Sequence, residues 1–93
     1  MAYEIVINKR FTNRMLKLLD CLKAEWGQKV ANEFQDKAFV RIYMLSLNPF
    51  IGAPTSIVNV RSTLITKHNR MYYRVIGKQV IILNIYDTKR NKK

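Results

Sequence analysis

The alternation of hydrophobic and polar residues along the chain predicts one strand, two helices and then three further strands. Residues 3–8 are short, rich in β-branched side chains and partly alternating, which is typical of a strand. In residues 9–26 and again in 28–47, apolar side chains recur every three or four positions, as on one face of an amphipathic helix. The inner faces predicted for the two helices consist of Phe11, Met15, Leu18, Leu19, Leu22 and Trp26, and of Val30, Ala31, Phe34, Ala38, Ile42 and Leu45.

Glycine and proline residues mark the ends of these segments. Gly27 alone separates the two helices, and so short a connection predicts that they fold back as a hairpin, with Trp26 packed between them. Pro49 ends the second helix because it cannot extend a helix and biases Asn48 away from helical angles. Gly77 and Lys78 suit a two-residue turn between the last two strands.

Three runs of branched and aromatic residues, at 57–66, 70–76 and 79–86, predict the remaining strands. Their alternation places one set of side chains toward the helices, namely Val58, Val60, Leu64, Met71, Tyr73, Val75, Ile81, Leu83 and Ile85. The opposite face then collects Arg61, Arg70, Tyr72, Arg74, Asn84 and Tyr86. The expected fold is α+β in the order β-α-α-β-β-β, with a helical hairpin on one face of a mostly antiparallel four-stranded sheet, in a single domain over residues 1–93.

Positive charge is concentrated in the second part of the chain. The net charge is +11, and residues 1–36, with six basic and five acidic side chains, contribute only +1 of it. Residues 37–93 carry eleven basic side chains and a single acid, Asp87. Such a field attracts polyanions or an acidic protein, although a surface kept soluble by lysines is the plainer interpretation.

Composition excludes several classes of protein. A single cysteine, Cys21, leaves no internal disulfide framework and no cysteine-built zinc site. No metal cluster or cofactor motif is visible, so neither a metal nor a cofactor is expected. No apolar run approaches the ~18–20 residues that span a bilayer, and the first residues lack the apolar core of a signal peptide. We therefore expect a cytoplasmic protein without membrane association.

The order of several short motifs resembles the RelE/ParE superfamily of bacterial toxins, the stable partners in toxin–antitoxin (plasmid-stabilisation) modules. The resemblance covers nearly the whole chain and rests on the strand at 5–7, Glu25-Trp26-Gly27 with Ala31 and Phe34, Leu47-Asn48-Pro49 with Gly52, Val60-Arg61, the run from Arg70 to Val75, and the strand at 81–87 followed by Lys89-Arg90. It implies inhibition of growth, an acidic antitoxin as partner, assembly with that antitoxin into a hetero-oligomer, and a cytoplasmic location.

Two branches of this superfamily have different targets. Members resembling RelE cut mRNA on the ribosome, and members resembling ParE poison DNA gyrase. The resemblance to the nuclease branch aligns Arg70 and Arg90 with its arginines, whereas Arg61 and Thr63 replace two lysines. Nuclease members also place a tyrosine, or a histidine and a tyrosine, in or just after the tail, and residues 88–93 contain neither. Because arginine stays protonated and cannot serve as a base at neutral pH, we favour gyrase inhibition.

The alternatives remain a ribosome-dependent mRNA endoribonuclease and, from another class, a non-toxic nucleic-acid-binding module. If the chain is a nuclease, the candidate catalytic residues are Arg61, Arg70, Arg90, His68 and Tyr86. The candidate residues for binding the target or the antitoxin are Arg61, Arg70, Tyr72, Arg74, Lys89 and Arg90. For His68 a solvated turn is the competing interpretation, and for Tyr86 it is packing at the end of the last strand.

Overall fold

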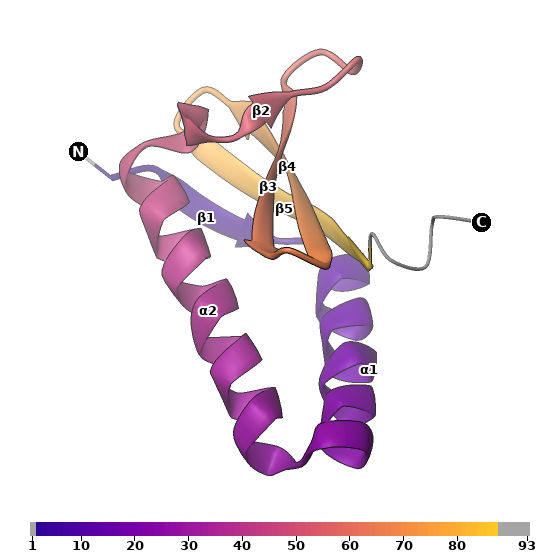
Figure 1. Ribbon diagram of the computed structural model, residues 1–93. Coiled ribbons are helices and arrows are strands. Elements are labelled where there is room, and N and C mark those ends of the chain that lie inside the picture. The colour runs from indigo at the N-terminus through magenta and orange to yellow at the C-terminus, as the bar shows by residue number, and fades with distance from the viewer. Residues whose placement is uncertain (1, 88–93) are drawn as a thin grey trace.

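The structure, a computed structural model that describes residues 2–87, consists of a helical hairpin packed on a twisted sheet (Figure 1). The elements follow in the order β1 (Glu4–Ile7), α1 (Lys9–Trp26), α2 (Gln28–Leu47), the 3-10 helix η1 (Pro49–Ile51), β2 (Ala53–Pro54), β3 (Val60–Thr66), β4 (Asn69–Ile76) and β5 (Gln79–Asp87). The expected α+β class and the helical hairpin are confirmed, with both helices beginning and ending at the predicted residues.

Local hydrogen bonds explain why the two helices have these ends. The side-chain oxygen of Asn8 accepts a hydrogen bond of 2.8 Å from the Arg10 N–H and caps the start of α1. Gly27 has a φ of 99°, in the region that favours glycine, and its N–H donates to the Lys23 carbonyl at 3.0 Å. The chain therefore reverses within one residue, and α2 runs back toward the sheet.

The sheet has five strands in the order β1-β5-β4-β3-β2, one more than the sequence predicts. The first strand, β1, pairs in parallel with β5, and the other neighbours are antiparallel, which confirms the mostly antiparallel arrangement. The additional strand β2 pairs Ala53 with Ser62 and Pro54 with Arg61. A run of two residues that includes a proline has no alternation to detect, which is why the prediction missed it.

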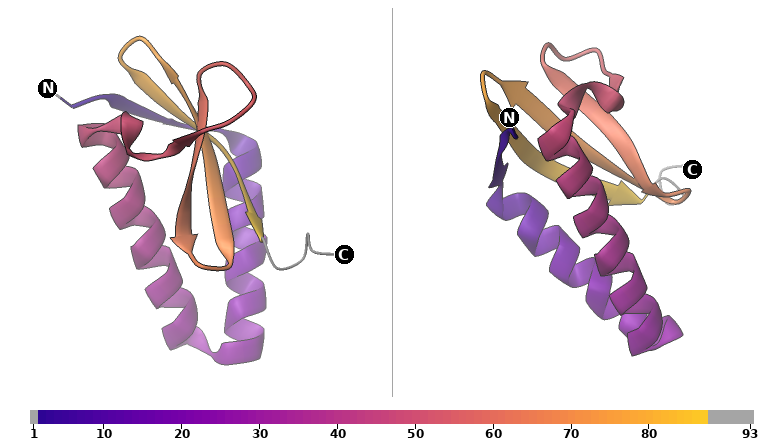
Figure 2. Two further views of the ribbon diagram at one scale, coloured as in Figure 1. Left: turned by 45° about the horizontal axis from the view of Figure 1, so that its top comes forward. Right: turned by 90° about the vertical axis from the view of Figure 1, so that its left-hand side faces the viewer.

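Both helices lie on the same side of the sheet (Figure 2), and their inner faces form one core with β3, β4 and β5. The buried residues of this core are Phe11, Met15, Phe34, Ala38, Ile42, Leu45, Ile65, Met71, Tyr73, Val80, Ile82 and Ile85. Trp26 does not pack between the helices, as the sequence suggested, because 67% of its surface is exposed. The hairpin end extends beyond the sheet there, so no strand covers it (Figure 1).

The faces of β3 are opposite to those that alternation predicted. Cross-strand partners share a face, and Arg61 is opposite Tyr73, whose ring is fully buried in the helix-facing core. Val60, Ser62 and Leu64 are opposite Arg74, Tyr72 and Arg70, so they lie on the face away from the helices. Val58 precedes the strand and is 79% exposed. The prediction failed because apolar residues occur on both faces of this strand.

In β5 a β-bulge changes which side chains face the helices. Tyr73 pairs with Ile82 but Tyr72 pairs with Asn84, so Leu83 is the extra residue between them. Val80, Ile82 and Ile85 are therefore in the core, whereas Ile81 is opposite Arg74 on the other face. The prediction that Ile81 faces the helices is wrong, because simple alternation assumes a strand without a bulge.

A buried tyrosine and an arginine hold the loop that joins α2 to the sheet. The Tyr73 hydroxyl donates to the Pro49 carbonyl at 2.7 Å and accepts from the Gly52 N–H at 3.0 Å. On the same face, Arg61 Nη1 donates to the Gly52 carbonyl at 2.7 Å, and its guanidinium lies 5.2 Å from the centre of the Phe50 ring. Arg61 therefore has a structural role at this loop, whatever else it binds.

Tyr73 also makes stability depend on pH. Burial raises the pKa of Tyr73 above its ordinary value of 10.0, although the Gly52 hydrogen bond and the charge of Arg61 act in the opposite direction. Because the folded state binds the Tyr73 proton more tightly than the unfolded state does, Tyr73 contributes to stability at pH values below its pKa in the unfolded state. This contribution to the free energy of unfolding is lost as the pH rises through the pKa of Tyr73 in the folded state.

We expect Tyr73→Phe to lower the free energy of unfolding by about 1–3 kcal/mol at pH 7, since two buried backbone groups lose their partner. The difference between the two proteins should shrink above pH 10, where the wild type loses the contribution of its protonated tyrosine. Urea unfolding between pH 7 and 11 measures both effects. Tyr43→Phe is the matched control, because Tyr43 is 64% exposed, and an equal loss in both variants would contradict the role given to Tyr73.

Candidate functional site

The face of the sheet away from the helices carries a cluster of basic and aromatic side chains. We call it the open face and define it by Arg70, Tyr72 and Arg74 of β4 with Asn84 and Tyr86 of β5. Arg70 is opposite Tyr86 in the strand register, and Tyr72 is opposite Asn84. Five of the six residues that alternation placed on this face are thus brought together, and Arg61 is the exception.

Direct contacts order the side chains of the open face. Arg70 Nη1 donates a hydrogen bond of 2.8 Å to the Ser62 hydroxyl of the neighbouring strand. The rings of Tyr72 and Tyr86 meet edge to face, with their centres 5.6 Å apart. Asn84 Nδ2 donates to the Tyr86 hydroxyl at 3.1 Å, and Asn84 Oδ1 accepts from the Ile85 N–H. Arg70 and the two tyrosine rings are therefore held in place before any ligand binds, whereas the buried Nε of Arg74 has no hydrogen-bond partner.

An arginine of α1 joins this cluster around the edge of the sheet. The pairing of β1 with β5 stops at Ile82, and α1 continues along the edge of β5 that β1 leaves uncovered. The Arg14 guanidinium lies 4.9 Å from the centre of the Tyr86 ring, a cation–π distance. The sequence analysis missed Arg14 because residues 1–36 are nearly neutral as a whole. The helical spacing of Arg10, Arg14 and Lys17 was the signal that could have revealed it.

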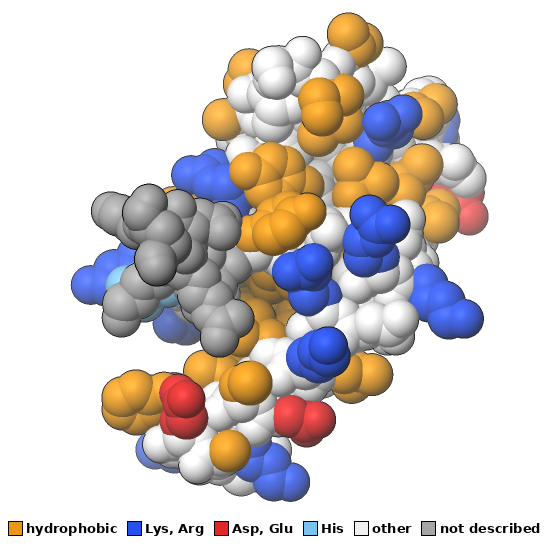
Figure 3. All heavy atoms as spheres, turned by 90° about the vertical axis from the view of Figure 1, so that its right-hand side faces the viewer, with side chains coloured by type: hydrophobic (Ala, Val, Ile, Leu, Met, Phe, Trp, Pro, Cys, Tyr) orange, Lys and Arg blue, Asp and Glu red, His pale blue; other side chains and the backbone are white. Residues whose placement is uncertain are grey.

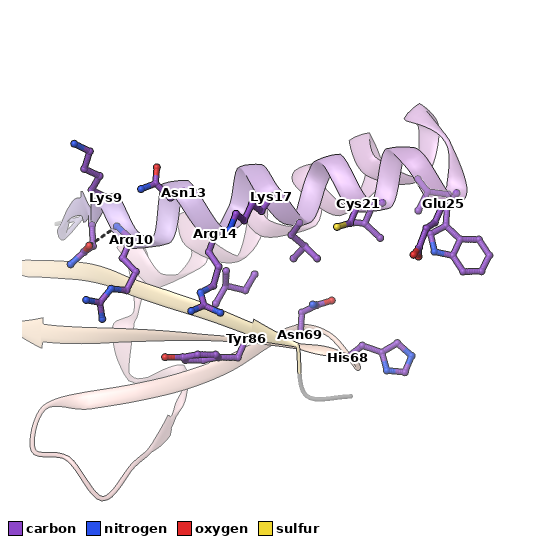
Figure 4. A pocket seen from close by; sticks show the side chains of 16 residues that line it. Lys9, Arg10, Asn13, Arg14, Lys17, Cys21, Glu25, His68, Asn69 and Tyr86 are labelled. Atoms are coloured by element: carbon purple, nitrogen blue, oxygen red, sulfur yellow. Dashed lines mark hydrogen bonds between the residues drawn. The ribbon is translucent and has the colours of Figure 1, made fainter. Parts of the chain in front are cut away.

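A long groove separates α1 from the ends of β4 and β5, and we call it the α1 groove (Figure 4). Its wall on α1 begins with basic side chains, which Figure 4 shows over Tyr86, and continues with apolar ones toward the hairpin end. Lysine and arginine side chains border an apolar hollow on this side of the molecule (Figure 3). The residues that line the groove include Lys9, Arg10, Arg14, Lys17, Leu18, Leu22, Glu25, Trp26, Val30, His68, Ile85 and Tyr86.

The remaining candidate residues lie apart from the open face or outside the described residues. His68 is exposed in the turn between β3 and β4 and lines the α1 groove across from α1 (Figure 4). Its backbone N–H donates to the Thr66 hydroxyl at 3.2 Å, as in a tight turn. Lys89 and Arg90 lie outside the described residues, so their roles stay predictions.

The chemistry that the open face can perform is the binding of anions. Two guanidinium groups provide charge and fixed donors for phosphates or carboxylates, and two tyrosine rings provide apolar surface. None of its five residues is an Asp, a Glu or a His, so a conventional general base is missing from the set. Of the two tyrosine hydroxyls on the open face, that of Tyr86 lies within hydrogen-bond distance of a neighbouring side chain, the amide of Asn84.

Two features that bear on function are absent from residues 2–87. Neither helix is long and apolar enough to cross a membrane. In the same part of the chain, no group of three or more His, Cys, Asp or Glu side chains is placed to hold a metal ion.

Comparison with known proteins identifies the fold. No protein-family model and no curated protein sequence matches the chain. Among solved structures, a chain of the chromosomal ParDE toxin–antitoxin system from P. aeruginosa is 18% identical, with a TM-score of 0.80 over 92% of this chain and 96% of that chain. A chain of the RelBE2 toxin–antitoxin complex from Mycobacterium tuberculosis is 19% identical, with a TM-score of 0.62 over 94% and 99%.

A chain of the DinJ-YafQ toxin–antitoxin complex from E. coli is 10% identical, with a TM-score of 0.68 over the whole of both chains. Each similarity thus covers more than nine-tenths of both chains, with the helical hairpin and the sheet together. At these identities the likeness concerns the fold alone. The chain therefore has the fold of the RelE/ParE toxins, as its sequence motifs suggested.

Proposed function

We propose that the chain is the toxin component of a toxin–antitoxin module, that an acidic antitoxin neutralises it, and that it inhibits DNA gyrase in the manner of ParE. The supporting observation is the open face, a set of two arginines and two tyrosines without a carboxylate or an imidazole. Such a face can bind a target tightly, but it lacks the carboxylate or imidazole that commonly serves as the general base in strand cleavage.

A second candidate function, mRNA cleavage on the ribosome, is favoured by one contact. Arg70 and Tyr86 are direct cross-strand partners, so a phosphate held by the arginine would lie near a phenol. In that case the Tyr86 hydroxyl would donate a proton to the leaving oxygen, and Arg70 would stabilise the charge that develops on the phosphate. The non-toxic nucleic-acid-binding module would instead show salt-sensitive binding to naked DNA or RNA without any effect on growth.

One pair of substitutions separates these functions. We expect wild-type chain to inhibit gyrase supercoiling in vitro and to leave transcripts intact after induction in cells. Arg70→Ala should weaken gyrase inhibition by about tenfold or more, because it removes a charged contact at the target. Tyr86→Phe should retain inhibition, since it keeps the ring that Arg14 and Tyr72 contact and loses only the hydroxyl.

Primer extension on total RNA provides the matching measurement for the nuclease. Codon-positioned cuts in mRNA that disappear in both Arg70→Ala and Tyr86→Phe would replace gyrase by the ribosome as the target. Lys37→Ala serves as the control, because Lys37 is exposed on α2, and both helices lie on the other side of the sheet from the open face. Nucleic-acid binding without either activity would refute the toxin proposal.

A further inference from the structure

The side of α2 that points away from the core carries a row of large apolar side chains, each of them at least 40% exposed. We call this row the α2 stripe and define it by Phe39, Val40, Tyr43, Met44 and Leu47 of α2 with Phe50 of η1. Helical spacing places its members opposite the buried Ala38, Ile42 and Leu45. Figure 2 (right) views the molecule from the side of α2, which lies in front of the sheet and of α1.

The α2 stripe is larger than the apolar patches that monomeric proteins usually leave in water. The exposed fractions of its six residues correspond to roughly 700 Å² of accessible surface, whereas the largest such patch on a typical monomer is about 300–600 Å². In positions 38–47 of α2 only Arg41 and Ser46 are polar, and a helix that is apolar on all sides is normally buried. A second molecule is therefore expected to cover the stripe.

We propose that the α2 stripe binds the same stripe of a second copy of this chain, so that two chains form a dimer with antiparallel α2 helices. Tyr43 is the midpoint of the stripe along α2, and a twofold axis through it brings each end of one stripe to the other end of its partner. A standard interface takes about 800 Å² from each partner, close to what the stripe exposes. The inference goes beyond the proposed function and does not depend on the target.

Charged residues at the two ends of the stripe are complementary in an antiparallel pair. Asp36 is exposed one helical turn before Phe39, on the same side of α2. At the other end, the Arg61 guanidinium lies 5.2 Å from the centre of the Phe50 ring. Within the described residues its hydrogen bonds run through Nη1, so its other N–H groups can meet a carboxylate. Asp36 of each copy thus approaches Arg61 of the other, and an ion pair forms at both ends.

Two other kinds of occupant fit the stripe less well. An acidic antitoxin is attracted by positive charge, whereas the exposed carboxylates of Glu33 and Asp36 border the stripe and repel it. The same carboxylates would face the anionic headgroups of a membrane, where surface helices carry lysine and arginine instead. A second copy of the chain supplies its own Arg61 to Asp36. Because both helices lie on one side of the sheet, the dimer leaves the two open faces accessible (Figure 2).

Sedimentation equilibrium of the full chain measures the dimer directly. The mass should rise from 11.0 kDa toward twice that value as the concentration increases to about 200 μM, with a Kd in the micromolar range. Tyr43→Glu sets two carboxylates against each other at the axis and should raise that Kd by about 30-fold or more. Leu16→Glu is the matched control, since Leu16 is 57% exposed on α1, outside the stripe, and should change the Kd by less than about threefold.

A pair of lysine substitutions tests the ends of the interface. Asp36→Lys and Asp20→Lys change the net charge equally, and both residues are exposed. Asp36→Lys places a cation near Arg61 of the other copy and should raise the Kd of the dimer by about tenfold. Asp20→Lys lies on α1, away from the stripe, and should raise it by less than about threefold.

Disulfide formation tests whether the two helices are antiparallel. The exposed Cys21 is first replaced by serine, so that the added cysteine is the one thiol of each chain. Two thiols from Tyr43→Cys meet at the axis, within the reach of a disulfide. Two thiols from Asp36→Cys are about 21 Å apart along the helices. Mild oxidation should therefore link chains with Tyr43→Cys and leave chains with Asp36→Cys unlinked.

The proposal is overturned if the wild type keeps the mass of a monomer at about 200 μM, if Tyr43→Glu and Leu16→Glu act alike, or if both cysteine variants are linked equally. A monomer that binds phosphatidylcholine–phosphatidylglycerol vesicles through Tyr43 would assign the stripe to a membrane instead. A monomer whose complex with the proposed antitoxin is lost in Tyr43→Glu would assign it to the antitoxin. A dimer that neither inhibits gyrase nor cuts mRNA would refute the proposed function and leave this interface standing.

Discussion

Gly52→Ala is expected to lower the free energy of unfolding by about 3 kcal/mol, the largest effect of any single substitution considered for this chain. A methyl group at Gly52 would point at the Tyr73 hydroxyl and would lie 2.8 Å from the Ser62 carbonyl oxygen. The Tyr73 ring is fully buried and its hydroxyl bonds both Pro49 and Gly52, so it cannot move without breaking these bonds. For a chain of this length the midpoint of thermal unfolding should fall by at least about 10 °C.

Gly77→Ala is the control that separates this packing effect from the loss of a glycine. Gly77 has a φ of 56° and nothing within 4 Å of the position where a methyl group would stand. Its substitution should therefore lower the free energy of unfolding by only about 1 kcal/mol, through backbone strain alone. Gly52 has an ordinary φ of −79°, so strain does not add to its effect. If urea unfolding shows equal losses in the free energy of unfolding for Gly52→Ala and Gly77→Ala, the loop at Gly52 adjusts to the methyl group and does not hold Tyr73 in place.

The helices were predictable because their signals are local. The spacing of apolar residues, the single Gly27 and the Asn48-Pro49 pair lie within the segments that they delimit, and the structure has the helices at 9–26 and 28–47 as expected. Trp26 was misassigned for a global reason. Periodicity places it on the inner stripe of α1, but the hairpin extends beyond the sheet, so nothing opposes that side chain.

The faces of the strands depend on register, which alternation alone does not determine. A single extra residue at Leu83 moves Val80 and Ile82 into the core and Ile81 out of it. The same limit applies to β3, where Val60, Ser62 and Leu64 share a face with Arg74, Tyr72 and Arg70. All five members of the open face were nevertheless predicted, because β4 alternates without interruption from Arg70 to Arg74, and Asn84 and Tyr86 follow the bulge in β5.

The basic half of the α1 groove could not be inferred from charge counts. Arg10, Arg14 and Lys17 belong to a segment whose acidic residues nearly cancel them, and only the three-dimensional fold shows that most of those acids lie elsewhere. The contact of Arg14 with Tyr86 joins residues 72 positions apart in the sequence. The open face and the α1 groove thus meet at Tyr86.

Reversing two charges on the open face should weaken the complex with the antitoxin by about 100-fold. Arg70 and Arg74 are half-buried, so their charges are less screened than those of fully exposed lysines. Arg70→Glu with Arg74→Glu turns attraction for an acidic protein into repulsion, and Arg70→Gln with Arg74→Gln should have an intermediate effect. The affinity for the proposed acidic antitoxin, measured by calorimetry, provides the test.

Salt and a second charge reversal show whether the effect belongs to this surface. The affinity of the wild type should fall as ionic strength rises, and that of the reversed variant should fall less, since salt screens attraction and repulsion alike. Lys29→Glu with Lys37→Glu makes the same change of net charge on exposed positions of α2 and should weaken binding by less than about threefold. If this control weakens the complex as much as the reversal on the open face, net charge and not Arg70 and Arg74 would account for recognition. Arg70→Gln with Arg74→Gln controls for misfolding of the reversed variant, because glutamine keeps polar side chains of similar length on β4 and places no carboxylate on the sheet.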